Sequence, residues 1–545
     1  MVVASAGTLA GHIKKGAYFD SVTLMTIGRH VQGLPGVLDA AVVMGTPENR
    51  AILAASGLLL PEFEQARDTD LLIALKLAEA GRVETVLAEI DQQFQLARSR
   101  KTQGAEARPR SLDGALEVLP GANLALISVA GRYAADEARA ALERGLHVML
   151  FSDNVPIDQE IALKQLAAER GLLVMGPDCG TAIVNGVPLG FANVVPRGAI
   201  GVVAAAGTGL QEVTTLIARG GGGISQALGT GGRDIKAKVG GVSFATALEA
   251  LADDPHTEVI LLIAKPPDPL VAERLSAIVK NVTKPVVTLF LGDRGGAEAG
   301  PATLEEAALA ALALWRGADL ATGLAGLPGR GQDQLAEAER MAARLPASRR
   351  YLRGLFSGGT FCAEAQVILA QDTIAAGRGF PLLAPLFSNA PTGATARLDS
   401  ALVSLAHTVV DLGEDEFTQG RPHPMIDYSL RLRRLAAEAA DPEVAVVLLD
   451  VVLGYGSHED PASELAPAIA AARDRVAVVC SVTGTEADPQ SRSRTVRQLE
   501  AAGAVVAPSN AAACHLAGWI ARLQEDRHLG NTEPPAIVHP QENRP

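Results

Sequence analysis

The sequence predicts a multidomain α/β protein, on three observations. The chain has 545 residues, which is too long for a single hydrophobic core. Apolar strand-like runs alternate with amphipathic helical runs, as in parallel sheets covered by helices. Two stretches, 198–290 and 354–482, repeat the same order of phrases, each opening on an apolar strand that enters a glycine-rich turn and a helix. We therefore expect two copies of one α/β unit within a larger set of domains.

Composition and charge exclude several classes of protein. The net charge of -13 and the isoelectric point near 5.4 argue against a nucleic-acid-binding protein, which needs a basic face. The sequence has neither a signal-peptide pattern nor a run of about 20 apolar residues, so no membrane partner is expected. The cysteines stand far apart, without metal-ligand spacing, at Cys179, Cys362, Cys480 and Cys514. The simplest interpretation is a cytoplasmic protein with reduced thiols and no metal site.

The first 105 residues predict a small ferredoxin-like α+β domain. Strand-like runs lie at 21–27, 40–45 and 70–78, and a helix is expected from Val83 to about Ala97. The polar run 97–110 has no apolar periodicity and predicts a linker.

Residues 106–196 predict a Rossmann-type domain. Strands are expected at 123–130, 147–152 and 172–180, with helices at 132–145 and 158–171. Ligands of such sheets bind at the carboxyl ends of the strands, which makes Gly131, Arg132 and Asn154 candidate cofactor-binding residues. These positions are also loops in every fold of this kind. The GxGxxG fingerprint is absent, which disfavours NAD and leaves adenine nucleotides or coenzyme A open.

The two repeats predict domains over 197–320 and 350–525, with a linker at 321–349 and a tail at 526–545. Each repeat opens on a glycine-rich helix start, where unpaired N–H groups and the helix dipole favour an anion such as phosphate. The candidate substrate- or phosphate-binding residues are Gly207, Thr208 and Gly209 in the first copy, and Ser357, Gly358, Gly359 and Thr360 in the second. The alternative is an ordinary strand-to-helix turn, but the duplication, together with the family resemblance described below, favours anion binding.

Loops near these turns offer candidate catalytic and substrate-binding residues. Arg233 of the first copy and Arg421 of the second could each clamp an anion, and His423 could move a proton. Asn389 and Thr392 lie on a long loop of the second copy that could close over a substrate. A solvated loop is the alternative interpretation for each.

Three further residues are expected to have structural roles and not catalytic ones. Glu212 and Glu364 occupy matching positions near the starts of two helices and are expected mainly to complement the helix dipoles. Cys179 is expected to be an inert buried thiol.

Several phrases resemble known families. The run from about 120 to 310 resembles the alpha chain of succinyl-CoA synthetase, with a GPNC-like turn at Gly176-Pro177-Asp178-Cys179 that ends the coenzyme-A-binding domain. With MGTPENR, GLFSGGTFCAEA and DLGEDEFTQGRPHPMID, the whole chain is identified as a member of the FdrA family. The resemblance implies a ferredoxin-like domain, a CoA-binding-type Rossmann domain and two flavodoxin-like ligase domains.

One departure bears on the chemistry. Succinyl-CoA synthetases pass phosphate through a histidine in a GHAGA-like loop, whereas residues 291–300 read LGDRGGAEAG and contain none. Glu298 cannot replace a phosphohistidine, so that cycle would need a histidine from elsewhere, such as His423. A complete ATP-grasp domain is also missing from the sequence.

The FdrA resemblance implies a subunit of an oxamate carbamoyltransferase in purine- or allantoin-derived ureide breakdown. That enzyme interconverts oxalurate plus phosphate with oxamate plus carbamoyl phosphate. The reaction needs a positioned phosphate and oxyanion donors but no covalent carrier. It requires no cofactor, although coenzyme A or a nucleotide remains possible, and we expect an oligomer with partner subunits from the same gene cluster. The alternatives are an acyl-CoA synthetase or CoA transferase, and a non-catalytic scaffold or regulatory subunit.

Overall fold

The structure is a computed structural model. It describes residues 7–530 except 18, 20, 47–48, 51–52, 55, 103–108, 110, 293–299, 320–331, 371–381, 394 and 419–421. The chain divides into two compact units, the first formed by Met1–Val118 with Asp415–His423 and the second by Leu119–Glu414 with Pro424–Pro545. Among the described residues, no helix combines the length and the hydropathy that crossing a bilayer requires.

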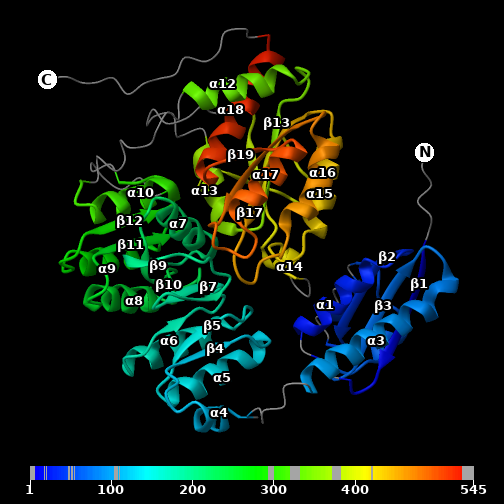
Figure 1. The fold of residues 1–545 in the computed structure, drawn as a ribbon, viewed down its shortest axis with the longest axis horizontal. Helices are drawn as coiled ribbons and strands as arrows, with labels where there is room; N and C mark the ends of the chain where they lie inside the picture. Colours follow the sequence, from blue (N-terminus) through cyan, green and yellow to red (C-terminus); the bar gives the residue numbers. More distant parts are fainter. Residues whose placement is uncertain are drawn as a thin grey trace. The chain divides into compact units, whose positions relative to one another are not determined.

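The first unit is a ferredoxin-like α+β domain with the antiparallel sheet order β1-β3-β2 (Figure 1). Its elements are β1 (Thr8–Lys14), α1 (Ser21–Gln32), β2 (Val37–Met44), η1 (Pro61–Gln65), β3 (Leu71–Leu77), η2 (Ala80–Arg82), α3 (Val83–Thr102), α4 (Leu112–Val118) and α14 (Asp415–Thr418). The central strand β3 is apolar on both faces. Leu71, Ile73 and Leu75 pack with residues of α1 and α3, while Leu72 and Ala74 pack with Phe63 and its neighbours.

The expected strand at 21–27 is wrong, because these residues form α1. Leu24, Ile27 and Val31 are all buried, and their spacing places them on one face of a helix. Burial of that face against the sheet overrode the local strand propensity of SVTLMTI. The first strand, β1, lies earlier and was not expected, and α3 continues to Thr102, into the expected linker.

The second unit begins with a parallel Rossmann-type sheet in the order β4-β5-β6. Its elements are β4 (Leu124–Ile127), α5 (Gly131–Glu143), β5 (His147–Leu150), α6 (Ile157–Glu169) and β6 (Val174–Met175). The strands and helices expected from the sequence are all present in order. Strand β6 is much shorter than the strand expected at 172–180.

The first ligase-type domain has the sheet order β12-β11-β9-β10-β7-β8. Its elements are β7 (Thr181–Val184), β8 (Val187–Gly190), β9 (Arg197–Ala204), α7 (Gly207–Arg219), β10 (Ile224–Gly229), α8 (Val242–Asp253), β11 (Val259–Ala264), α9 (Pro269–Val279), β12 (Val286–Phe290) and α10 (Leu304–Trp315). The hairpin β7–β8 adds to this sheet because β7 pairs antiparallel with β10. This sheet therefore includes residues that precede the expected domain start at 197.

The second ligase-type domain has a parallel sheet in the order β15-β14-β16-β13-β17-β18-β19. Its elements are α12 (Gln332–Ala343), β13 (Tyr351–Phe356), α13 (Gly359–Leu369), β14 (Leu386–Ser388), β15 (Ala396–Arg397), β16 (His407–Asp411), α15 (Ser429–Ala440), β17 (Val444–Val452), α16 (Pro461–Ala472), β18 (Ala477–Thr483), α17 (Arg492–Ala502), β19 (Val505–Ala507) and α18 (Asn510–His528). Strands β16-β13-β17-β18-β19 form the doubly wound, flavodoxin-like order. Helix α12 occupies part of the expected linker and packs against α18.

The two ligase-type domains share one hydrophobic core. Leu210 of α7 and Leu304 of α10 belong to the same buried cluster as Phe361 of α13 and Ala512 of α18. The four helices therefore pack together, which brings the starts of α7 and α13 to one interface (Figure 1).

Candidate functional site

The two glycine-rich turns, far apart in the sequence, are in contact. Helix α7 begins at Gly207 and helix α13 at Gly359. A Cβ atom on Gly358 would overlap Thr208 Oγ1, and one on Gly209 would lie 2.8 Å from Thr360 Cγ2. Only glycine allows this approach from either side. The structure thus brings together the residues that the sequence singled out in the two turns.

The contact between the two turns brings together hydrogen-bond donors that the helices themselves do not use. The first intrahelical bond of α7 runs from Leu210 N to Ala206 O (3.0 Å), and that of α13 from Cys362 N to Gly358 O (3.1 Å). The N–H groups before Leu210 and Cys362 therefore lie at the positive ends of two helix dipoles. Thr208 Oγ1 is buried and has no hydrogen-bond partner among the described residues. This combination of donors suits an oxyanion.

Ser357 has a different role from its neighbours. Its N–H donates to Asp450 Oδ1 (2.8 Å) and its hydroxyl donates to Asp450 Oδ2 (2.7 Å). Asp450 in turn forms a buried ion pair with Arg431 Nη2 (2.7 Å). Both donors of Ser357 are used by Asp450, so they are not available to a ligand. We infer that Ser357 holds the second turn in position.

Two glutamates join the ligase-type domains reciprocally. Asn510 N, at the start of α18, donates to Glu212 Oε1 (3.0 Å), and Leu304 N, at the start of α10, donates to Glu364 Oε1 (2.7 Å). Each glutamate therefore binds the start of the last helix of the other domain. The sequence suggested only that they complement a helix dipole, and their cross-domain partners could not be read from it.

The same glutamates have perturbed acidity. Burial raises the pKa of Glu364 to about 8, against the hydrogen bonds from Asn510 and Leu304, and the nearby Glu212 and Glu305 add to the rise. Burial also raises the pKa of Glu212, although hydrogen bonds from Thr483 and Asn510 oppose the change. The domain interface therefore holds carboxyl groups that resist ionisation.

Lys265 and Asp411 complete the surroundings of the α13 start. Asp411 Oδ2 lies 2.5 Å, and Lys265 Nζ 3.6 Å, from the position of a Cβ on Gly359. Burial raises the pKa of Asp411 to about 7, partly offset by Lys265. Sequence reasoning assigned neither residue to the site. Lys265 follows β11 in the first copy and Asp411 ends β16 in the second, so no local pattern joins them.

Asn389 and Thr392 support this region from the long loop. Asn389 Nδ2 donates to Asp411 O (2.9 Å) and Asn389 Oδ1 accepts from Asp411 N (2.9 Å), which holds the end of β16. Thr392 Oγ1 donates to Gln366 Oε1 (3.1 Å) on α13.

Arg233 lies at a different contact. Its Nη2 is 2.9 Å from Glu160 Oε2 and donates to Val155 O (2.8 Å), while the adjacent Asp234 pairs with Lys164 (2.8 Å). These bonds join the first ligase-type domain to α6 of the Rossmann-type domain. The structure therefore does not bring Arg233 to the glycine turns.

Three other residues named from the sequence cannot be placed at the turns. Arg421 and Glu298 lie outside the described residues. His423 belongs to the segment Asp415–His423, which is part of the first unit.

The Rossmann-type candidates lie where the strand order predicts. Gly131 starts α5, and a Cβ atom at this position would overlap Asp153 O, next to Asn154, which has a positive φ of 53°. The Arg132 guanidinium lies 5.0 Å from the centroid of the Tyr133 ring, and Tyr133 and Val129 are exposed. A cation, an aromatic ring and an apolar side chain fit the nucleotide part of coenzyme A chemically.

Cys179 matches its structural interpretation. The thiol is buried, its Sγ donates to Gly229 O (3.3 Å), and burial raises its pKa to about 12. A thiol with so high a pKa carries almost no thiolate at neutral pH.

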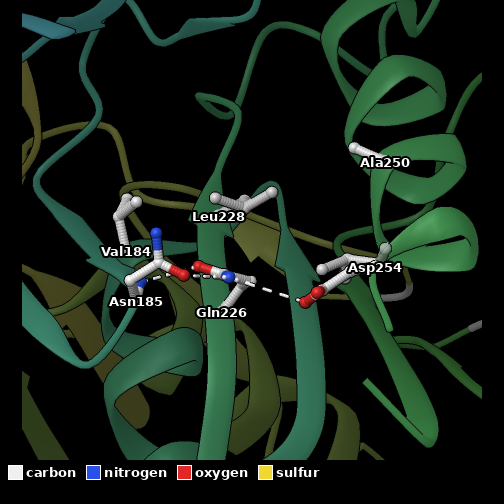
Figure 2. A pocket seen from close by; sticks show the side chains of 7 residues that line it. Val184, Asn185, Gln226, Leu228, Ala250 and Asp254 are labelled. Carbon is white, nitrogen blue, oxygen red and sulfur yellow. Dashed lines mark hydrogen bonds between the residues drawn. The ribbon is translucent and has the colours of Figure 1, made fainter. Parts of the chain in front are cut away.

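An open pocket lies away from the glycine turns, against β7, β10 and α8 (Figure 2). It measures about 210 Å³ and is lined by Val184, Asn185, Gln226, Leu228, Ala250, Leu251 and Asp254. Its polar groups bind one another, since Gln226 Nε2 donates to Asn185 Oδ1 (2.8 Å) and Asn185 N donates to Gln226 Oε1 (2.7 Å). Nothing in this lining indicates a reaction.

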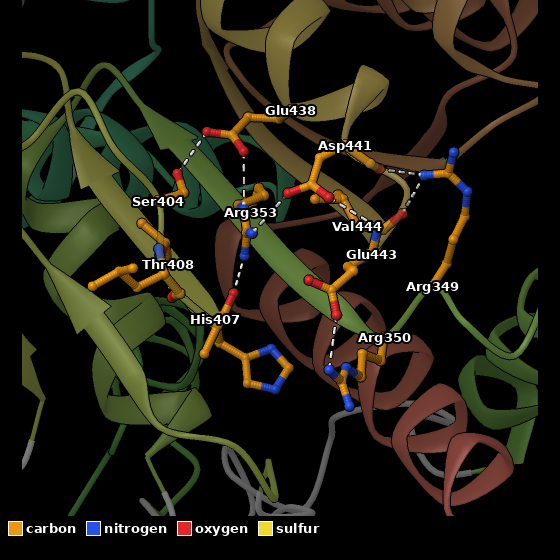
Figure 3. A network of polar contacts seen from close by, with 12 residues as sticks. Arg349, Arg350, Arg353, Ser404, His407, Thr408, Glu438, Asp441, Glu443 and Val444 are labelled. Atoms are coloured by element: carbon orange, nitrogen blue, oxygen red, sulfur yellow. Dashed lines mark hydrogen bonds and ion pairs between the residues drawn. The ribbon is translucent and has the colours of Figure 1, made fainter.

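A second polar cluster lies at the amino ends of the strands of the second ligase-type domain (Figure 3). Arg353 Nε donates to Glu438 Oε2 (2.9 Å), Ser404 donates to Glu438 Oε1 (2.6 Å), and Arg350 pairs with Glu443 (2.8 Å). Here the charges neutralise one another, which is typical of a structural network.

Comparisons with known proteins identify the family. YahF of Escherichia coli is 43% identical over 517 residues, which cover 91% of this chain and 96% of YahF. The chain belongs to the YahF family. A family described as CoA-ligase matches residues 355–520, and one described as "AllF, heavy metal-associated domain" matches residues 8–110. Residues 355–520 of this YahF-family chain are thus similar to CoA-ligase domains, and FdrA membership stays a prediction.

More distant proteins match part of the chain. The alpha subunit of succinate–CoA ligase from Methanothermobacter thermautotrophicus is 27% identical over 173 residues, 31% of this chain and 57% of that subunit. The chain therefore spans little more than half of that relative. The solved structure of PH0766 from Pyrococcus horikoshii matches with a TM-score of 0.27 and 16% identity, covering 75% of this chain and 85% of that one. The sheet topology of this chain defines its fold.

The domain that matches the heavy-metal-associated family differs from a thiolate metal site in its residues. Residues 8–110 contain no cysteine, so thiolate ligands are missing from this domain. Within the described ranges, no group of three or more His, Cys, Asp or Glu side chains could hold a metal ion.

Proposed function

We propose that this protein is the anion-binding subunit of an enzyme of the CoA-ligase superfamily, and that its paired helix starts hold the phosphoryl group of an acyl phosphate. The observation that carries the proposal is the contact between the two turns, where Thr208 Oγ1 is buried without a partner among the described residues. A buried hydroxyl is normally hydrogen-bonded, so Thr208 Oγ1 is a group available to bind a ligand. Backbone N–H groups of α7 and α13 would bind the oxygens of the same ligand.

The acceptor favoured by the comparisons is coenzyme A. The match of residues 355–520 to CoA-ligase and the likeness to an alpha subunit of succinate–CoA ligase support an acid–thiol ligase or a CoA transferase. Bound coenzyme A would supply the thiol that accepts the acyl group. Arg132, with Gly131 and Asn154 beside it, would hold the nucleotide part of the cofactor.

A second candidate function is carbamoyl transfer between phosphate and oxamate. The specific observation in its favour is the loop 291–300, which has no histidine to carry a phosphoryl group. The resemblance to FdrA also favours it. Direct transfer of a carbamoyl group needs a bound phosphate and oxyanion donors, which the turns can provide without a covalent intermediate.

The residues outside the turns would have supporting roles in either reaction. We propose Arg421 as the clamp for a substrate carboxylate and His423 as the proton carrier. Arg233 would act as a positioning residue through Glu160, and Asn389 and Thr392 through Asp411 and Gln366. We also propose a cytoplasmic location and partner subunits that complete the enzyme.

Two assays separate the candidates. Purified protein, alone and with the products of neighbouring genes, is incubated with carbamoyl phosphate plus oxamate, and phosphate release is followed. In parallel it is incubated with coenzyme A, ATP and a panel of carboxylic acids, and thioester formation is followed. Phosphate release that depends on oxamate supports carbamoyl transfer, and thioester formation supports the ligase. If neither assay shows activity with all partners present, both enzyme functions are contradicted and the non-catalytic scaffold becomes the favoured function.

A variant tests the site itself. Thr208→Val removes the unpartnered hydroxyl and should lower the rate of the active assay about tenfold or more, with unchanged or higher stability. Thr215→Val is the matched control, because Thr215 lies on the same helix and its hydroxyl donates to Glu212 O (3.0 Å). An unchanged rate in the Thr208 variant would place the ligand elsewhere.

A further inference from the structure

The start of α13 faces two opposite charges that do not form an ion pair with each other. Asp411 Oδ2 and Lys265 Nζ lie 2.5 Å and 3.6 Å from the same point, the position of a Cβ on Gly359. Lys265 is half-buried, and its ammonium group makes no hydrogen bond or ion pair with the residues that the structure describes. A lysine held against a helix start without a partner is a cation available to an anionic ligand.

We propose that this point is a proton-coupled anion site, in which an oxyanion binds Lys265 and the α13 start while the carboxylate of Asp411 takes up a proton. The inference rests on the proposed anion-binding function and names the residues that regulate it. The supporting observations are independent of the helix dipole. Thr208 Oγ1 is buried, unpartnered and directed at Gly358, the residue before α13, and Lys265 is unpaired among the described residues.

The coupling follows from the position of Asp411. A bound anion and an ionised Asp411 would share one helix start and one ammonium group, so they repel each other. Protonation of Asp411 removes the repulsion, and the proton comes from solvent. The titratable or charged groups that face Asp411 are Lys265 from the loop after β11, Glu414 after β16, Asp450 on β17 and Cys362 on α13.

The affinity for an anion should depend on pH through the ionisation of Asp411. Burial raises the pKa of Asp411 to about 7, against the effect of Lys265. Well below that pH the carboxyl group is already neutral, so an anion binds without proton uptake. Above it the carboxyl group is ionised, and binding must draw in a proton. Affinity should therefore fall as pH rises through the pKa, by up to about tenfold per pH unit.

The test uses sulfate, a tetrahedral dianion that does not itself titrate near neutral pH. Sulfate binding to the full chain is measured by calorimetry at about pH 6 and about pH 8.5, in buffers of different ionisation enthalpy. We expect uptake of about one proton at the higher pH and almost none at the lower. Sulfate binding without proton uptake at the higher pH would overturn the proposal.

Three variants and one control variant sharpen the result. Asp411→Asn should abolish proton uptake and give at high pH the affinity that the parent protein has at low pH. Lys265→Met should weaken sulfate binding about tenfold or more at both pH values, and Lys265→Arg should keep most of it. Lys280→Met is the matched control, because Lys280 is an exposed lysine of the same domain. If Lys265→Met and Lys280→Met behave alike, Lys265 is not the ligand.

Failure of this inference differs from failure of the proposed function. Proton-coupled sulfate binding by a chain that is silent in both enzyme assays would keep the site and reject the activity. If Thr208→Val loses activity while Asp411→Asn leaves the sulfate affinity and the proton uptake unchanged, the proposed function is kept and the coupling is rejected. The thermal midpoint of each variant shows whether it is folded, and the conservative Lys265→Arg variant keeps the test valid if Lys265→Met is not.

Discussion

The two ligase-type domains share a backbone frame and differ in what their strand ends carry. Thr230 N donates to Ala204 O (2.9 Å) in the first domain and Leu412 N donates to Phe356 O (2.8 Å) in the second. These bonds occupy equivalent places, so Gly229 is the counterpart of Asp411. A side chain at Gly229 would meet Thr181 O at 2.5 Å. The hairpin that extends the first sheet thus fills the space that the second domain uses for a carboxyl group.

The difference extends to the neighbouring strand. In the second domain, Ser357 and the Arg431–Asp450 ion pair brace the turn, whereas Ala205 stands at the position of Ser357 in the first. The first domain contributes Lys265 instead, across the interface. The two domains therefore have matching helix starts but carry different ionisable groups beside them.

The largest effect should come from making the two strand ends alike. Gly229→Asp places a Cβ against Thr181 O and leaves a carboxylate without a partner, so we expect a loss of about 4 kcal/mol or more in unfolding free energy. Asp411→Gly, the reverse exchange, should cost about 1 kcal/mol. Urea denaturation of both variants measures the difference. Equal losses of unfolding free energy in the two variants would contradict the structural difference between the strand ends at Gly229 and Asp411.

The brace of the second turn gives the next effect. Asp450→Ala leaves Arg431 buried without its partner and should lower the unfolding free energy by about 3 to 4 kcal/mol. The double variant Asp450→Leu with Arg431→Met should recover part of the loss, because no buried charge remains although Ser357 loses the acceptor of its N–H and hydroxyl. Chemical denaturation provides the measurement, and a small loss in the single variant would contradict the structural role of the pair.

The reciprocal glutamates predict a pH dependence of stability. The pKa of Glu364 is raised to about 8 in the folded chain, above its unfolded value, so its contribution is present at low pH. That contribution is lost as pH rises from about 4.5 to about 8, with a limiting slope of about 1.4 kcal/mol per pH unit. Glu364→Gln should flatten the profile over that window. The exposed Glu249→Gln on α8 is the control, and a profile that it changes equally would refute the assignment.

The smallest effect is expected at the contact with the Rossmann-type domain. Arg233 is 41% exposed and shares Glu160 with the fully buried Lys164. Arg233→Ala should therefore lower the unfolding free energy by about 1 kcal/mol or less. Activity should fall only in proportion to any loss of folded protein. A large fall in activity at unchanged stability would instead show that Arg233 reaches a substrate.

Much of the fold could be predicted from local patterns. Apolar strands that enter glycine turns identified both ligase-type domains, and alternating strands and helices identified the Rossmann-type sheet. The prediction failed where local propensity and packing disagree, as at α1, whose buried residues Leu24, Ile27 and Val31 face a sheet formed by distant residues.

The sequence alone determined that two glycine-rich helix starts exist, because strand, turn and helix are each encoded within about ten neighbouring residues. Only the tertiary structure decided that these starts touch, that Glu212 and Glu364 bind the other domain, and that Lys265 meets Asp411. Such contacts join segments that lie far apart in the chain. They depend on how α7, α10, α13 and α18 fill one core, which no local period or motif records.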